Sequence, residues 1–134
     1  PERDVFERYW RGVMMVPERA LFIGRLDGVV AGSVQLVSLP VQKEAWRHGC
    51  QIDTHFVAPW ARGHGLARAL MEAAEVEARD KGFRVINLSV RKTQDVAIKL
   101  YESLGFARWG TNPTYAMIKG EMVPGHFYVK DLEG

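Results

Sequence analysis

Phe56–Arg68 reads FVAPWARGHGLAR and joins a strand-like run, Gln51–Val57, to a helix-like run, Leu66–Lys81. Between the two runs the chain turns over Gly63 and Gly65. The first turn of a helix exposes unpaired N–H groups and the positive end of the helix dipole, so it binds anions readily. Glycine has no side chain that would keep a phosphate away from the backbone. The segment therefore predicts a strand, a pyrophosphate-binding turn and a helix.

Two common nucleotide-binding turns do not fit this segment. A P-loop requires a lysine and a hydroxyl residue directly after its second glycine, and neither follows Gly65. A dinucleotide-binding fingerprint requires a small residue where Arg68 stands, and an acidic residue at the end of the next strand, which reads Ser89-Val90-Arg91. Two interpretations stay open on this segment alone. One is an anion-binding turn of the form Arg62-x-x-Gly65-x-Ala67, and the other is an ordinary glycine-rich loop.

The composition indicates one compact domain over residues 1–134, with 47% hydrophobic and 25% charged residues. The net charge is +2 and the basic residues are interspersed with acidic ones, which predicts no nucleic-acid partner. No apolar run is long enough to span a membrane. Cys50 is the only cysteine, which excludes an internal disulfide and fits a reducing, cytoplasmic location; we expect it to be a small buried residue. No residue spacing is typical of a metal site.

Hydrophobic periodicity and turn residues predict the order of the elements. Pro1–Val16 is expected to be a helix. Three antiparallel strands follow at Ala20–Leu26, Val29–Val37 and His48–Val57, with Asp27-Gly28 as a hairpin turn and Pro40–Arg47 as a connection. After the helix Leu66–Lys81 we expect a strand at Val85–Val90 and a helix over 93–104 that Thr93 caps and Gly105 ends. The closing strands are Ala107–Asn112 and His126–Asp131, with turns at Lys119-Gly120 and Pro124-Gly125 between them.

Each helix is expected to bury one face. The predicted buried positions are Leu66, Leu70, Ala73, Ala74 and Ala78 in the first, and Val96, Ala97, Leu100 and Leu104 in the second. Glu72, Glu75, Arg79 and Asp80 are expected to face away. A strand, a helix and a strand joined across the glycine turn make a right-handed crossover with a parallel pair. We therefore expect an α+β fold with a mixed antiparallel and parallel sheet and helices on both faces. Because the chain does not begin with Met, we also expect that an N-terminal piece, including a strand, is missing.

A second motif makes a resemblance to one family specific. Ala97–Phe106 reads AIKLYESLGF and follows the glycine turn after one helix and one strand. The turn resembles the Q/R-x-x-G-x-G/A motif of the GNAT superfamily of N-acetyltransferases, and the second motif resembles the A-x-x-L-Y-x-x-x-G-F signature of the same enzymes. In element order the resemblance covers residues 20–132. It implies a GNAT-like fold with a splayed pair of strands, and acetyl-CoA as the acetyl donor.

The resemblance implies donor-binding roles on both sides of the turn. In the family, the pantetheine arm of acetyl-CoA pairs with the splayed strand, here through the backbone of His55, Phe56 and Val57. Gln94 stands where family members often have an asparagine that contacts CoA. The pyrophosphate would be held by backbone N–H groups next to Arg68. These groups belong to Arg62, Gly63, His64, Gly65, Leu66 and Ala67.

The resemblance also implies an acid and a base. Tyr101 matches the tyrosine that protonates the departing thiolate in many members, and the alternative is a core tyrosine with a satisfied hydroxyl. Ser89 occupies the position of a frequent glutamate and cannot act as the base. Gln51, Asp53 and His55 alternate along one strand and are expected to share a face. Asp53 is the preferred base, directly or through a water, and His55 is the second choice. A water chain without a dedicated base is a further alternative.

Acceptor specificity in the family resides in segments that correspond to Phe6–Val16, Pro40–Arg47 and Gly110–Gly125. Tyr115-Ala116-Met117 is expected to line the acceptor pocket, and the sequence around it loosely resembles enzymes that acetylate small amines. We therefore expect an N-acetyltransferase that moves an acetyl group to a primary amine of a small molecule by direct attack in a ternary complex. A homodimer fits the resemblance. Two alternatives stay open: a protein or peptide N-acetyltransferase, and a non-catalytic acyl-CoA-binding or sensing module, which Ser89 favours.

Overall fold

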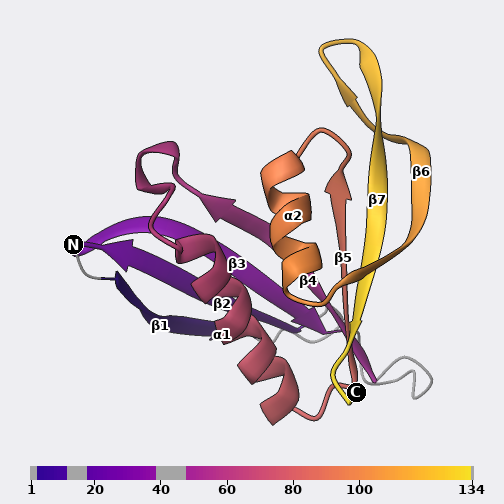
Figure 1. Ribbon diagram of the computed structural model, residues 1–134. Helices are drawn as coiled ribbons and strands as arrows, with labels where there is room; N and C mark the ends of the chain where they lie inside the picture. The colour runs from indigo at the N-terminus through magenta and orange to yellow at the C-terminus, as the bar shows by residue number, and fades with distance from the viewer. Residues whose placement is uncertain (1–2, 12–17, 39–47, 134) are drawn as a thin grey trace.

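The described residues, 3–11, 18–38 and 48–133, form a seven-stranded mixed sheet with two α-helices in a computed structural model. The elements in chain order are β1 (Arg3–Arg11), β2 (Glu18–Leu26), β3 (Val29–Ser38), β4 (Gly49–Val57), the short 3-10 helix η2 (Pro59–Ala61), α1 (Leu66–Asp80), β5 (Val85–Arg91), α2 (Asp95–Ser103), β6 (Ala107–Ile118) and β7 (Glu121–Asp131). In the sheet the strands lie in the order β1-β2-β3-β4-β5-β7-β6. Figure 1 shows α1 crossing the half of the sheet formed by the first strands, and α2 beside β5.

Two tight turns connect antiparallel strands through residues with positive φ. Asp27 and Gly28 have φ values of 52° and 80°, and Lys119 and Gly120 have the same values. Positive φ at both central residues is the type I′ turn, whose twist matches that of the strands it joins. Both predicted turns are confirmed. The predicted turn at Pro124-Gly125 is wrong, because those residues lie within β7 and the strands run up to the turn at 119–120.

The segment Arg3–Arg11 is a strand and not the helix that was predicted over Pro1–Val16. It pairs antiparallel with β2 at the edge of the sheet, where Arg8 lies opposite Phe22. Residues 12–17 and 39–47, with the expected connection Pro40–Arg47, lie outside the described residues. The helix was predicted from aromatic and β-branched residues, which suit a strand as well as a helix face. Pairing with a neighbouring strand decides which of the two forms. The residues are Val5, Phe6, Tyr9 and Trp10.

Both helices lie on the same face of the sheet, so the prediction of helices on both faces is wrong for the described residues. Tyr128 and Lys130 are two residues apart in β7 and point to one face. The Tyr128 hydroxyl donates to Glu102 of α2 at 2.9 Å, and Lys130 Nζ donates to Glu75 of α1 at 2.7 Å. In β5 the alternate residues Ile86, Leu88 and Val90 are buried. Alternation of this kind marks a buried face of a strand but does not say which helices cover it.

The helix α1 packs on the sheet through the predicted stripe, of which Leu66, Leu70, Ala74 and Ala78 are at most 1% exposed. Its last residue is Asp80, Lys81 is the C-cap, and Gly82 follows with φ of 82°, within one residue of the predicted end. The buried face of α2 is rotated from the predicted one, because Val96 is 84% exposed and Tyr101 only 6%. Thr93 does not cap α2; the residue at the cap is Gln94, which makes no side-chain capping hydrogen bond.

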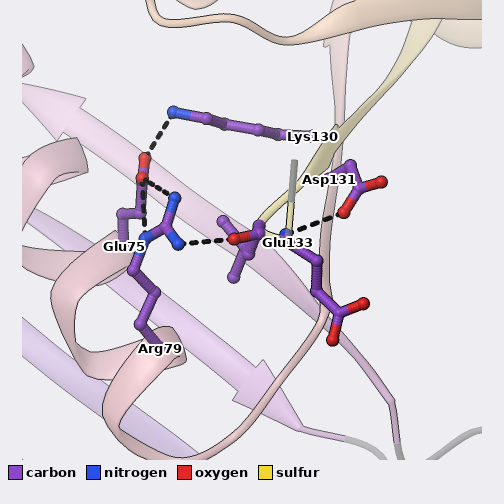
Figure 2. Close-up of polar contacts among 6 residues, drawn as sticks. Glu75, Arg79, Lys130, Asp131 and Glu133 are labelled. Carbon is purple, nitrogen blue, oxygen red and sulfur yellow. Dashed lines mark hydrogen bonds and ion pairs between the residues drawn. The ribbon is translucent and has the colours of Figure 1, made fainter.

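Glu75 was expected to face away from the core, but it links α1 to the last strand, β7, through a hydrogen-bonded ion pair. Its carboxylate accepts hydrogen bonds from Lys130 Nζ at 2.7 Å and from Arg79 Nη2 at 3.0 Å. Arg79 also donates through Nη1 to the Leu132 carbonyl, and Figure 2 shows Glu75 between its two basic partners. Burial raises the pKa of Glu75, but the hydrogen bonds from Lys130 and Arg79 outweigh burial and lower that pKa overall.

Replacing Glu75 by glutamine is expected to lower the free energy of unfolding by about 1 kcal/mol at neutral pH. The folded-state pKa of Glu75 lies below its ordinary value of 4.5, so its contribution is complete above that value and is lost as the pH falls through the folded-state pKa. Urea unfolding of Glu75→Gln and the wild type, from neutral pH down to about pH 3, measures the difference. The exposed Glu72 on the same helix provides a control, Glu72→Gln. A difference that persists unchanged in acid would contradict the ionic origin.

Candidate functional site

The strands β4 and β5 are parallel neighbours at one end only. Although β4 continues to Val57 and β5 to Arg91, their pairing consists of Gly49↔Val85, Cys50↔Ile86 and Gln51↔Asn87. Figure 1 shows the two strands diverging beyond these pairs. Because β4 stays paired with β3 and β5 with β7 on their outer edges, the edges that face each other, β4 from Ile52 and β5 from Leu88 onward, both lose their neighbour. This confirms the splayed strand pair, and such an edge can pair with an extended ligand.

A β-bulge at Thr54 turns the end of β4. Thr54 has φ of 51°, and β4 advances three residues from Asp53 to Phe56 while β3 advances two from Gln35 to Ser33. One extra residue reverses the alternation of side chains beyond it. Asp53 and His55 therefore point to opposite faces, and the prediction that they share a face is wrong. The sequence gives no sign of the bulge, because positive φ is an outlier for a β-branched residue.

On the helix face, His55 connects three elements. Its Nδ1 lies 2.8 Å from the Tyr101 hydroxyl of α2, and its Nε2 lies 3.2 Å from the Ala67 carbonyl oxygen in the first turn of α1. The two rings lie 5.8 Å apart, and Phe106 packs edge-on against Tyr101 at 6.1 Å. His55 and Tyr101 are 46 residues apart in the chain. Their contact therefore comes from the tertiary fold and not from the local geometry of a turn or a helix. Sequence reasoning named both residues but missed their contact.

Burial keeps both groups neutral near pH 7. Burial lowers the pKa of His55 to about 4, and the hydrogen bond to the Ala67 carbonyl opposes that shift only in part. Burial raises the pKa of Tyr101 to about 12. The imidazole is therefore a hydrogen-bonding group without charge, and the phenol keeps its proton. The site thus holds a proton donor next to the unpaired edge of β4.

Asp53 lies on the opposite face, away from Tyr101. Its Oδ2 is 3.2 Å from Arg19 Nη1, and the two side chains are 48% and 47% exposed. The same Arg19 nitrogen donates to Gln35 at 3.0 Å. We call the opening between β4 and β5 beyond Gln51 and Asn87 the splay. Because of the bulge at Thr54, the Asp53 carboxylate lies on one face of the sheet beside the splay and the Tyr101 phenol lies on the other.

The glycine turn leads directly into α1 beside the splay. Gly63 and Gly65 have φ values of 87° and 75°, and α1 has no acidic residue in its first turn. The first helical hydrogen bond runs from the Ala69 N–H to the Gly65 carbonyl at 3.1 Å. The N–H groups of residues 66–68 precede it and are available to an anion. The local geometry therefore fits a phosphate group.

The side chains around this turn differ in what they can contribute. Arg62 and His64 are exposed, whereas the Leu66 side chain is 1% exposed, so that only its backbone can contact a ligand. Arg68 reaches across to α2 and donates to Ser103 Oγ at 2.7 Å. At the end of β4 the Phe56 side chain is 53% exposed and Val57 is half-buried. Gln94 is exposed at the start of α2.

A second cluster lies on the face opposite the helices, where Ser89 projects from β5. The Ser89 and Tyr115 hydroxyls are 2.7 Å apart. The Tyr115 ring packs edge-on against Phe127 at 5.9 Å, and Trp109 lies 5.4 Å from Phe127. A Cβ on Gly125 would come within 2.2 Å of the Tyr115 ring, so the ring lies directly on the backbone of β7. A glycine inside a strand pattern was the one sequence signal of this close approach.

Cys50 is buried, as predicted, with its Sγ 3.5 Å from the Val85 carbonyl oxygen. Burial raises the pKa of its thiol to about 12, so it is not a nucleophile at neutral pH. Among residues 3–11, 18–38 and 48–133, no three His, Cys, Asp or Glu side chains are grouped so that they could hold a metal ion. No helix in those ranges has the length and apolar character needed to cross a membrane.

Comparison with known sequences identifies relatives. The sequence model of the acetyltransferase (GNAT) family matches residues 1–106. An uncharacterized N-acetyltransferase of Azospirillum brasilense is 62% identical over 94 residues, which are 70% of this chain and 56% of the relative. A mycothiol acetyltransferase of Nocardiopsis dassonvillei is 45% identical over 60 residues, which are 45% of this chain and 18% of the relative. The chain thus spans about half the length of the first relative and less of the second.

Solved structures share the fold. An N-acetyltransferase from Staphylococcus aureus Mu50 superposes with a TM-score of 0.78 at 25% identity, over 85% of this chain and 68% of the other. A protein from Salmonella typhimurium, solved with its cofactor acetyl-CoA, superposes with a TM-score of 0.76 at 24% identity, over 85% of this chain and 65% of the other.

The bulge can be tested by glycine substitution at two positions of β4. Glycine in a regular strand lowers the free energy of unfolding by about 1 kcal/mol, which we expect for Gln51→Gly. At Thr54 glycine also relieves the strain of a positive φ, so Thr54→Gly is expected to leave the free energy of unfolding unchanged or to raise it by about 1 kcal/mol. Denaturant unfolding measures both variants. An equal loss of stability at the two positions would indicate a regular strand at Thr54.

Proposed function

We propose that this chain, which belongs to the acetyltransferase (GNAT) family, is an acetyl-CoA-dependent N-acetyltransferase acting on a primary amine of a small molecule. The observation that carries the proposal is the placement of three features at one point. These are the edge of β4 that has no strand partner after Gln51, the start of α1 behind two glycines of positive φ, and the buried phenol of Tyr101.

The extended part of the donor would pair with the backbone of β4 at His55, Phe56 and Val57, in the place that β5 leaves. Its pyrophosphate would meet the N–H groups of the turn and of the first turn of α1, over residues 63–68. The predicted contact through the Arg62 N–H is not included, because that group donates to the Pro59 carbonyl at 3.4 Å. Gln94, exposed at the start of α2, is a further contact from the opposite side of the splay. Acetyl-CoA supplies an activated thioester there. The Salmonella neighbour, solved with acetyl-CoA, supports this choice of donor.

Tyr101 is the proposed general acid. It keeps its proton at neutral pH, because burial raises its pKa to about 12, and a developing thiolate is a strong acceptor for that proton. Asp53 is the proposed base, directly or through a water, from the opposite face of β4. The Asp53 side chain is 48% exposed and lies 3.2 Å from Arg19 Nη1, so a water can reach its carboxylate. His55 is a poorer base, because both of its ring nitrogens already have partners.

The acceptor would approach on the face that carries Ser89 and Tyr115. Besides the ion pair of Asp53 with Arg19, this face beside the splay carries aromatic rings and uncharged hydroxyls: Phe56, Ser89, Trp109, Tyr115 and Phe127. Such a surface suits an amine with an apolar or aromatic body more than a polycation, since aromatic rings offer large apolar contact area. This favours a small-molecule amine over a basic protein tail. We propose direct attack by this amine while both substrates are bound.

Calorimetric titration with acetyl-CoA tests the donor site. We expect dissociation constants near the micromolar range, about −8 kcal/mol, with NAD and ATP as non-binding controls. Gly65→Glu places a carboxylate beside the pyrophosphate and is expected to weaken binding at least about tenfold relative to Gly65→Ala, because like charges repel. Both variants share the strain of a side chain at φ of 75°, so the alanine variant isolates the charge. Equal affinities of the two variants would contradict the pyrophosphate assignment.

Release of free CoA thiol in the presence of aliphatic amines, aromatic amines and peptides tests turnover and acceptor class. Tyr101→Phe is expected to lower kcat by about 100-fold with little change in acetyl-CoA affinity, because the hydroxyl acts on the leaving group. Tyr128→Phe is the matched control: it also removes the hydroxyl of a buried tyrosine, one that donates to Glu102 and not to His55. An unchanged kcat in Tyr101→Phe would remove Tyr101 as the acid, and binding without turnover on any amine would favour an acyl-CoA-binding module.

A further inference from the structure

The tautomer of His55 follows from its two contacts. A backbone carbonyl can only accept a hydrogen bond, so the Nε2 atom, 3.2 Å from the Ala67 oxygen, carries the ring proton. A neutral imidazole has one N–H, which leaves Nδ1 as an acceptor. The Tyr101 hydroxyl, 2.8 Å from Nδ1, must therefore be the donor of that hydrogen bond. The proton that the proposed reaction needs points at His55 when the site is empty.

The bulge creates this contact. Without the extra residue at Thr54, His55 would point to the same face as Asp53, on the side of the sheet away from α1 and α2. With the bulge, the ring spans from the end of β4 to the first turn of α1 and to the middle of α2. Thr54 holds a positive φ that is rare for a β-branched residue, and such strain is found where a side chain must be aimed.

The two acceptors that compete for the Tyr101 proton differ in strength. A thioester sulfur carries no charge and is a weak acceptor, whereas an imidazole nitrogen is a good one. Hydrogen bonds to a charged acceptor are roughly twice as strong as those between neutral groups. The hydroxyl therefore stays on His55 in the substrate complex and turns to the sulfur only when negative charge develops there. A contact made only in the transition state raises kcat without tightening substrate binding.

We infer that His55 is a positioning residue that acts through Tyr101, fixing its hydroxyl beside the sulfur and holding its proton until the thiolate forms. The inference rests on the proposed function. As the carbon–sulfur bond breaks, its electron pair stays on sulfur and the Tyr101 Oη proton moves to it, giving the thiol. The attacking nitrogen gives its proton to Asp53, directly or through a water, and Asp53 passes it to solvent. Tyr101 takes one proton back from solvent, and the hydrogen bond to Nδ1 forms again. His55 stays neutral throughout.

A double-mutant cycle on kcat tests whether His55 acts through Tyr101. His55→Leu removes the acceptor with little change in volume, and we expect kcat to fall by about tenfold with acetyl-CoA affinity unchanged, since a displaced catalytic group loses rate steeply. In the Tyr101→Phe background the same substitution is expected to have no further effect. His55→Asn, which keeps an acceptor and a donor, is expected to retain more activity than His55→Leu. Additive losses in the cycle, or equal losses for leucine and asparagine, would overturn the inference.

Nitrogen NMR of the wild-type protein tests the same inference without turnover. We expect the His55 resonances of a neutral ring with a proton on Nε2 and none on Nδ1 at neutral pH, and a shift of the Nδ1 resonance in Tyr101→Phe. His48, exposed directly before β4, provides the control variant His48→Leu for assignment and for kcat. A proton on Nδ1 would overturn the inference even if every His55 variant failed to fold. A wild type that binds acetyl-CoA but acetylates no amine would instead contradict the proposed function, while the NMR result would stand.

Discussion

The separation of β4 from β5 is the constraint around which this structure is arranged. After Gln51↔Asn87 the backbone of β4 has no strand beside it on that edge. Backbone N–H and C=O groups need partners, so an edge left open inside a sheet is a place for a ligand with the shape of a strand. The glycine turn and the start of α1 follow directly at the end of the same strand. One element therefore supplies the extended part of the site, and its continuation supplies the anion-binding part.

An opening of this kind must be held at a fixed width, and α1 does this by contacting both halves of the sheet. Its apolar stripe packs on the half formed by β1–β4, with Leu66 and Leu70 almost fully buried. Its polar edge reaches the other half, where Glu75 bonds to Lys130 of β7 and Arg79 bonds to the Leu132 carbonyl. The helix α2 is linked to α1 through Arg68 and Ser103. The interactions that stabilise the fold are therefore also those that set the distance between the two walls of the site.

Local chemistry made much of this predictable from the sequence. The turns at Asp27-Gly28 and Lys119-Gly120 and the stripe of α1 each depend on residues close in sequence, and each was predicted correctly. The failures have a different physical origin. The strand β1 depends on a partner that the segment cannot reveal, and the faces of the helices depend on packing. The bulge at Thr54 contradicts the preference of its own residue type, so propensity argued against it.

Because of the bulge, the sequence predicted which residues belong to the candidate site but not how they lie relative to one another. Motifs named His55, Asp53 and Tyr101, but regular alternation placed the first two together. In the structure His55 joins Tyr101 behind the splay, while Asp53 pairs with Arg19 on the other side. Two pairs of uncharged groups lie beside the end where a thioester would react: His55 with Tyr101, and Ser89 with Tyr115. The start of α1 lies at the end where phosphates would bind. Burial of Tyr101 lowers the local dielectric and so strengthens its hydrogen bonds, and its hydroxyl can then respond to the charge that develops on sulfur.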